Sequence, residues 1–233
     1  MVNGVPFWHH VGLGEAASAE DEALLGLAGT HIVASVAYIA TDTAASTEDV
    51  VVVERHNGVA KFIFGAICAP NGGAGGHCAA SEDEVDLVVA LLASFGVPSE
   101  RSDDIRSVVW TKLMGNTSWN CIAALTRSNM AACVADERLS GIARAVMEET
   151  VAVAAAMGIR VGMSVEKRME LSAKLRQSTF SPSMCQDALA GRRLEVDAIA
   201  DVVVRLGARL NVPTPTTAML AALTGGLDNA LRK

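Results

Sequence analysis

The spacing of hydrophobic and polar positions changes near residue 100. Before it, short runs rich in β-branched and aromatic residues occupy 31–40, 50–55 and 59–66, a composition typical of strands. His-Asn-Gly at 56–58 lies between the last two runs, and Asn-Gly is a favoured hairpin turn. We therefore predict that the second and third strands form a hairpin.

A glycine-rich stretch follows the third run and leads into a helix. Ser81 and Glu84 have the spacing of a capping box, so we predict a helix that begins at Ser81 and ends near Gly96. The stretch contains Gly-Gly-Ala-Gly-Gly at 72–76, which fits neither G-x-x-x-x-G-K-[ST] nor G-x-G-x-x-G. We interpret it as a flexible surface loop that does not bind phosphate.

From about residue 103 onward, apolar positions recur at helical spacing. The pattern predicts helices over 103–125, 136–158, a segment after Ser164, 183–191 and 195–210, with a last helix beyond Pro213 and Pro215. The sequence thus predicts a mixed α/β region over 1–100 and an all-helical region over 101–233.

Composition narrows the class of protein. The 233 residues suffice for one large or two small domains, and no apolar stretch is long enough to span a bilayer. No secretory signal is visible at the start of the sequence. The net charge of −7 argues against nucleic acid or an anionic membrane as the main partner.

The five cysteines are odd in number and widely spaced, and no C-x-x-C occurs. We expect reduced thiols in a cytoplasmic protein and no structural zinc site. The histidines, including His9 and His10, have no metal-ligand spacing with acidic or cysteine neighbours, so we assign no metal.

Three polar residues, spaced four apart, stand in an otherwise apolar helical segment. Lys112, Asn116 and Asn120 are expected to share one helical face. Such groups are costly to desolvate unless something polar faces them, and a substrate could do so. The alternatives are a lysine that extends to water from the helix edge and amides paired with neighbouring helices.

Ser183 and Glu195 bracket a second polar segment. Glu195 could accept a hydrogen bond from a substrate hydroxyl. Alternatively, it could be a carboxylate at a helix N-terminus, where the helix dipole favours negative charge. Ser183 could bind a carboxylate or cap a helix. A lysine that acts as a general acid, together with a carboxylate and amide side chains, could form a site for reducing a carbonyl.

Four segments, in order along nearly the whole chain, resemble the ketopantoate reductase family (2-dehydropantoate 2-reductase). They are NGVP at 3–6, DDIRSVVWTKLMGNTSWNCIAALT at 103–126, SMCQDALAGRRLEVDAI at 183–199 and NVPTPTT at 211–217. The resemblance implies an incomplete Rossmann-type nucleotide-binding domain over 1–100. It further implies a helical C-terminal substrate domain of the 6-phosphogluconate dehydrogenase C-terminal-like kind over 101–233.

The resemblance also implies residue roles. Lys112 would be the general acid that protonates the substrate's carbonyl oxygen, and Glu195 would bind the substrate's hydroxyl. The remaining implied contacts are to substrate from Asn116, Asn120, Asn129 and Ser183, and to the cofactor from Asn3. Asn116 and Asn120 would also orient Lys112.

The implied reaction is the NADPH-dependent reduction of 2-dehydropantoate to pantoate, on the route to coenzyme A. The cofactor supplies hydride, while the protein supplies orientation and the proton. The sequence has no G-x-G-x-x-G fingerprint, which would hold the pyrophosphate in a Rossmann half. We therefore expect this chain alone to bind a dinucleotide poorly.

Two other functions stay open. A reductase of another 2-oxo acid would be served equally well by a lysine and a glutamate, provided that its substrate has a nearby hydroxyl. A helical dimerisation or binding module without catalysis is favoured by the missing fingerprint. We expect a small-molecule 2-oxo acid as ligand and a homodimer formed through the helical domain.

Overall fold

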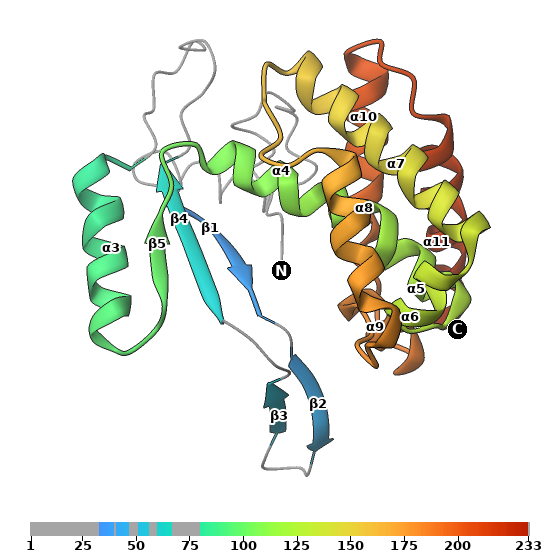
Figure 1. Cartoon of the computed structure of the whole chain (residues 1–233), viewed down its shortest axis with the longest axis horizontal. Helices are drawn as coiled ribbons and strands as arrows, with labels where there is room; N and C mark the ends of the chain where they lie inside the picture. Colours follow the sequence, from blue (N-terminus) through green and yellow to red (C-terminus); the bar gives the residue numbers. More distant parts are fainter. Residues whose placement is uncertain (1–32, 40, 47–50, 56–59, 67–79, 233) are drawn as a thin grey trace. The chain divides into compact units, whose positions relative to one another are not determined.

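The computed structural model describes residues 33–39, 41–46, 51–55, 60–66 and 80–232, of which 41–46 and 51–55 are described by their backbone alone. The chain divides into two compact units, residues 3–108 and 109–233, which we take in turn. Figure 1 shows the elements of both in chain order.

The first unit contains a small mixed sheet with the strand order β1-β4-β5. Its strands are β1 (Val33–Tyr38), β4 (Lys61–Ala66) and β5 (Ser99–Arg101). β1 runs antiparallel to β4, whereas β5 runs parallel to it, with Phe62 opposite Ser99. The parallel pair is joined through α3 (Glu82–Ser94), as parallel strands require a crossover connection.

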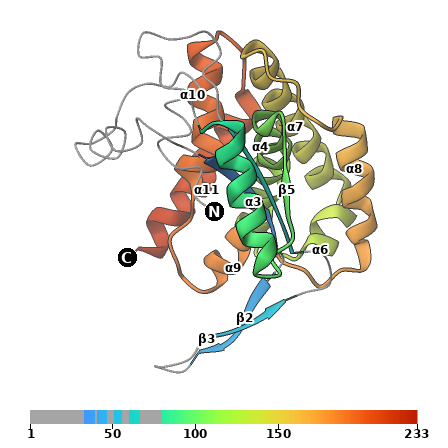
Figure 2. The same cartoon turned by 90° about the vertical axis from the view of Figure 1, so that its left-hand side faces the viewer.

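Helix α3 packs one face against this sheet (Figure 2). Val85 from the helix, Phe64 from β4 and Ala80 form the buried cluster between them. Ser81 caps the helix as predicted: its hydroxyl accepts the Glu84 N–H at 3.3 Å, and its own N–H donates to the Glu84 carboxylate at 2.7 Å. The helix ends before Gly96, whose φ of +74° suits glycine.

The predicted hairpin between 50–55 and 59–66 is wrong. Strand β3 (Val51–Arg55) pairs with β2 (Thr41–Ser46), from Thr41 opposite Arg55 to Ser46 opposite Val51, while β4 pairs with β1. The sequence TDTAAS of β2 has little β propensity, so its strand was not foreseen, yet it gives β3 a different partner. The turn at 56–58 and the glycine-rich stretch at 72–76 lie outside the described residues.

The second unit is helical, and the predicted helices are present with shifted ends. Its elements are α4 (Ile105–Gly115, which begins in the first unit), η2 (Asn116–Asn120), α5 (Cys121–Thr126), α6 (Met130–Ala135), α7 (Glu137–Ala156), α8 (Val165–Ala173), η3 (Lys174–Gln177), α9 (Ser183–Leu189), η4 (Asp197–Asp201), α10 (Val202–Arg209) and α11 (Pro215–Leu231). The run 103–125 is thus one continuous helix with a π turn, η2, inside it. No helix in the described parts of the chain is long and apolar enough to cross a membrane.

The core of this unit lies where α7 packs against α8, α10 and α11 (Figure 1). The fully buried side chains of this unit include Trp110, Met114, Val146, Met147, Met184 and Val203. Helix starts are capped locally: the Ser164 hydroxyl accepts the Lys167 N–H at 3.1 Å at the start of α8, the helix predicted to follow Ser164.

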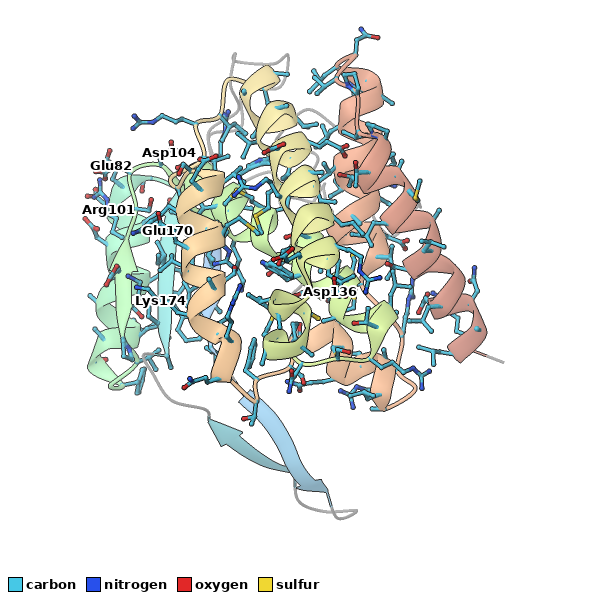
Figure 3. All side chains as sticks on the ribbon, turned by 45° about the vertical axis from the view of Figure 1, so that its right-hand side comes forward. Glu82, Arg101, Asp104, Asp136, Glu170 and Lys174 are labelled. Carbon is cyan, nitrogen blue, oxygen red and sulfur yellow. The ribbon has the colours of Figure 1, made fainter. Side chains whose placement is uncertain are left out.

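Asp136 lies between the end of α6 and the start of α7 and caps α7, at the position labelled in Figure 3. Its carboxylate accepts the Arg138 N–H at 2.8 Å and also binds the Arg138 guanidinium. The Arg138 side chain and these N–H groups lower the pKa of Asp136 to about 2. α6 itself was not predicted from the sequence, because six residues give too short a pattern to separate from a loop.

Candidate active site

Lys112 lies in α4 among side chains that are almost completely buried. Trp110 and Met114 are 0% exposed, whereas Lys112 is half-buried. Burial lowers the pKa of Lys112 to about 8, and the negative charge of Glu195 acts in the opposite direction. The structure therefore brings Lys112 and Glu195 together, although 82 residues of sequence separate them, and leaves the lysine protonated at neutral pH.

Glu195 stands in an irregular segment, 192–195, that precedes a helical stretch beginning at Val196. Its neighbours Leu194 and Val196 are each 3% exposed, whereas Glu195 is half-buried. The Leu194 N–H donates to the carboxylate of Asp228 in α11 at 2.7 Å. The peptide that precedes the glutamate is thus held by α11.

Asn116 and Asn120 are the first and last residues of η2. In an α-helix, residues four apart drift by roughly 40° around the axis, since each residue turns about 100°. A π turn closes i→i+5 hydrogen bonds and rotates less per residue, so it offsets that drift over the second step of the row. Asn120 is 7% exposed and Asn116 is half-buried, so the row remains on an inner face.

Buried hydrogen bonds fix η2 to its neighbours. The Thr117 hydroxyl donates to the Ile199 carbonyl in η4 at 3.2 Å, and the Trp119 indole donates to the Ser172 hydroxyl in α8 at 3.0 Å. Because η4 begins two residues after Glu195, the Thr117 contact ties the helix that carries the lysine and asparagines to the segment that carries the glutamate. Both segments contain a π turn, a feature often found at functional sites.

Ser183 and Asn129 lie on other elements of the same unit. Ser183 is the exposed first residue of α9, which packs against η2 and α5. Asn129 caps α6, and its side-chain oxygen accepts the Ala132 N–H at 3.0 Å. Their contacts to substrate stay predictions, and Asn3 lies outside the described residues.

Sequence reasoning missed Asp228, which anchors the segment of Glu195. The available signal was that Asp228 is the single charged residue in the stretch 218–231 of the last helix. Asp228 is only 5% exposed, and buried carboxylates are rare unless they are paired.

The cysteines of this unit are buried small residues. Cys121, Cys133 and Cys185 are each 0% exposed, and burial raises the pKa of the Cys121 thiol to about 12. Among the described residues, no group of three or more histidine, cysteine or acidic side chains could hold a metal ion. Cys68 and Cys78 lie outside the described residues.

The comparisons with known proteins agree on one family. Residues 104–228 match the family described as ketopantoate reductase PanE/ApbA C terminal. A 2-dehydropantoate 2-reductase of Mesorhizobium japonicum is 32% identical over 231 residues, which cover 96% of this chain and 66% of that protein.

Solved structures give the same answer. A PanE/ApbA family ketopantoate reductase from Ralstonia eutropha JMP134 is 28% identical with a TM-score of 0.68, covering 86% of this chain and 60% of that one. A 2-dehydropantoate 2-reductase from Geobacter metallireducens GS-15 is 26% identical with a TM-score of 0.72, covering 88% and 64%. The chain thus spans about half to two thirds of the length of the relatives it matches.

The fold and the site define a small mixed α/β sheet unit followed by a helical domain that sets a half-buried lysine beside a glutamate. The chain belongs to the ketopantoate reductase family, which confirms the resemblance drawn from its four sequence segments.

Proposed function

We propose that this chain forms the substrate-handling part of an NADPH-dependent 2-dehydropantoate 2-reductase. The observation that carries the proposal is the half-buried Lys112, whose pKa lies near 8, with the charge of Glu195 close to it. A lysine with this pKa can give up a proton near neutral pH far more readily than an exposed one. The Mesorhizobium japonicum relative carries the name of this activity and supports the assignment.

Each side chain has a role in this proposal. Lys112 donates its proton to the carbonyl oxygen of the 2-oxo acid as that oxygen becomes a hydroxyl. Glu195 accepts a hydrogen bond from the substrate's own hydroxyl and keeps the lysine charged by its proximity. Asn116 and Asn120 bind the substrate and orient the lysine, while Ser183 and Asn129 complete the contacts at its carboxylate end.

The described residues do not fit the pyrophosphate of the dinucleotide. Two helix N-termini among them follow a strand of the parallel pair, α4 after β5 and α3 after β4. At the start of α4, the Ser107 N–H donates to the Asp104 carboxylate at 3.1 Å. At the start of α3, the capping N–H is already taken by Glu84. The first turn of α3 carries Glu82, Asp83 and Glu84, which repel phosphate. We therefore assign the described residues to the substrate side of the reaction, and the choice of NADPH rests on the resemblance.

The binding of 2-dehydropantoate to the chain tests this function. Calorimetric titrations are made with and without NADPH, on the wild type, Glu195→Gln and Lys174→Met, the last being an exposed lysine on η3 (Figure 3). We expect Glu195→Gln to weaken binding roughly tenfold, because a hydrogen bond to a charged group is lost, while Lys174→Met leaves it unchanged.

A 2-oxo acid that lacks the hydroxyl serves as the substrate control. It should bind the wild type no better than 2-dehydropantoate binds Glu195→Gln. Equal affinity of both acids for the wild type would favour a reductase of another 2-oxo acid. Absence of binding under every condition would leave the non-catalytic helical module as the better assignment.

We further propose that the chain forms a homodimer through its helical unit. Met219 and Leu223 lie one turn apart on α11 and are 68% and 58% exposed, a pairing that favours burial against another apolar surface. A related protein from Staphylococcus aureus is described as a dimeric ketopantoate reductase. Sedimentation of wild type and Leu223→Glu should give a dimer and a monomer, and a monomeric wild type at micromolar concentration contradicts the proposal.

A further inference from the structure

The position of Glu195 depends on a segment with no regular secondary structure. Residues 192–195 belong to neither α9 nor the helical stretch that begins at Val196. The Arg192 N–H donates to the Asp187 carbonyl of α9 at 2.8 Å, which fixes the start of the segment but not the peptides next to Glu195. A side chain that binds substrate must be held within a fraction of an ångström, which requires support from other elements.

That support comes from Asp228, near the end of α11. Its carboxylate accepts the Leu194 N–H at 2.7 Å and binds the Arg232 guanidinium one turn further along the helix. Burial works to raise the pKa of Asp228, but the Leu194 N–H and the charges of Arg232 and Arg193 outweigh it, so its pKa lies below the ordinary value. The carboxylate is therefore charged at neutral pH and is a strong acceptor.

We propose that Asp228 is a positioning residue that fixes Glu195 beside Lys112 by holding the peptide N–H of Leu194. This deepens the proposed function, on which it rests for the role of Glu195 as a substrate ligand. The peptide that Asp228 holds is directly followed by Glu195, so a shift of that peptide moves the glutamate.

The residues that follow Glu195 are held by contacts of their own, so the backbone that precedes it depends on Asp228. Val196 is 3% exposed, and the Thr117 hydroxyl holds η4 through Ile199. Leu194 is also 3% exposed, so its N–H cannot turn to water without moving the segment. Since a buried donor without an acceptor is costly, loss of the Asp228 carboxylate should displace residues 192–195 toward solvent.

The pKa of Lys112, followed by NMR on the chain with 13C-labelled lysine, reports the position of Glu195 without any substrate. The charge of Glu195 raises that pKa, so Glu195→Gln should lower it. Asp228→Ala should lower it by a comparable amount, because the glutamate moves away. Asp228→Asn removes the charge but keeps an oxygen acceptor for Leu194, so it should leave the pKa of Lys112 close to the wild-type value.

Glu149→Gln is the matched control. Glu149 binds the N-terminus of the same helix, α11, through Thr216 and Thr217, and has no contact with residues 192–195 among the hydrogen bonds described. It should leave the pKa of Lys112 unchanged even if it destabilises the fold. Should Asp228→Ala not fold, Arg232→Met, which removes one of the two partners of Asp228, should lower the lysine pKa by a smaller amount.

Substrate affinity provides the second measurement. Asp228→Ala alone should weaken 2-dehydropantoate binding roughly tenfold, as Glu195→Gln alone does. Added to Glu195→Gln, it should have no further effect on binding. An Asp228→Asn variant that behaves like Asp228→Ala in the NMR titration would show that charge acts directly, and would overturn the positioning role. An unchanged lysine pKa in Asp228→Ala would overturn it too. If the NMR shifts appear and no 2-oxo acid binds, the positioning role stands and the proposed function fails.

Discussion

Buried hydrogen bonds between distant elements distinguish the second unit from the described part of the first. In the first, Arg101 pairs with Glu82, Asp86 and Asp103, carboxylates whose side chains are 57% to 91% exposed (Figure 3). Such surface pairs contribute little to stability. In the second, Thr117, Trp119 and Asp228 make hydrogen bonds that are buried and join distant elements.

The difference shows where geometric precision is needed. Surface ion pairs tolerate large movements of their side chains, whereas a buried donor or acceptor fixes the groups on both sides, because breaking it is costly. The second unit has surface ion pairs too, such as Arg144 with Glu166. Among the described residues, only the unit that carries Lys112 and Glu195 also has buried side-chain hydrogen bonds between distant elements. We therefore expect changes at matched residue types to have unequal effects in the two units.

The largest difference in the effect of substitution should be between Lys112 and Lys61. Lys61 pairs with Glu100 at 2.7 Å at the surface of the first unit. Lys112→Met should lower kcat by about 10²–10⁴-fold, the usual cost of a lost general acid, while Lys61→Met should leave kcat unchanged. NADPH oxidation with 2-dehydropantoate measures both, on a protein that joins this chain to a dinucleotide-binding half. A fall of less than about threefold for Lys112→Met would remove it from the role of acid.

The next difference should be between the effects of substituting Glu149 and Glu100 on the free energy of unfolding. The Glu149 carboxylate accepts the N–H groups of Thr216 and Thr217 at 2.9 and 2.8 Å and the Thr217 hydroxyl at 2.6 Å, so it caps α11 from α7. Glu149→Gln should lower the free energy of unfolding by about 1 kcal/mol, as for a lost helix cap. Glu100→Gln should change it by less than about 0.5 kcal/mol.

Urea unfolding at several pH values sharpens this second comparison. Burial works to raise the pKa of Glu149, but its hydrogen bonds with Thr217 and Thr216 outweigh burial, so the pKa lies below the ordinary 4.5. The contribution of a carboxylate with a depressed pKa is fully present above 4.5 and is lost as the pH falls through its folded-state value. The wild type and Glu149→Gln should therefore converge in acid, and a constant difference between them would argue against the cap.

The last comparison concerns the stability contributions of Lys112 and Lys61. Its pKa of about 8 in the folded protein lies below the ordinary 10.5, so burial disfavours the charged lysine below pH 8 and this penalty fades between pH 8 and 10.5. Lys112→Met should raise the free energy of unfolding at pH 7 by up to about 3 kcal/mol, since the shift from 10.5 to about 8 is roughly 2.5 pKa units at about 1.4 kcal/mol each. The gain should shrink by pH 10, whereas Lys61→Met should show no such trend.

Local signals in the sequence were sufficient for most helices of the structure. Ser81 and Glu84 form the predicted capping box, because its hydrogen bonds join residues only three apart. The cap bond of Ser164 is equally local, and the helix after it was predicted. The hairpin failed because strand pairing depends on a partner elsewhere in the chain, and TDTAAS gives no local sign of a strand. β5, with three residues, was too short to be recognised.

The site was predictable in its residue types but not in its support. The spacing of Lys112, Asn116 and Asn120 marked one helical face, and the family resemblance added Glu195. The π turn at 116–120 and the hold of Asp228 on Leu194 were not predictable, because both depend on contacts between helices far apart in sequence. Asn129 illustrates the limit, since one side chain fits both a helix cap and a substrate contact.

Helix α11 is fastened at both ends, by Glu149 at its start and by Leu194 near its finish. The length of its 17 residues, about 25 Å at about 1.5 Å per residue, therefore sets the separation of these two attachment points. Inserting one residue between 218 and 227 would rotate Asp228 by about 100° and advance it by about 1.5 Å, out of reach of Leu194. Substitutions along the outer side of this helix should be tolerated far better than any change in its length.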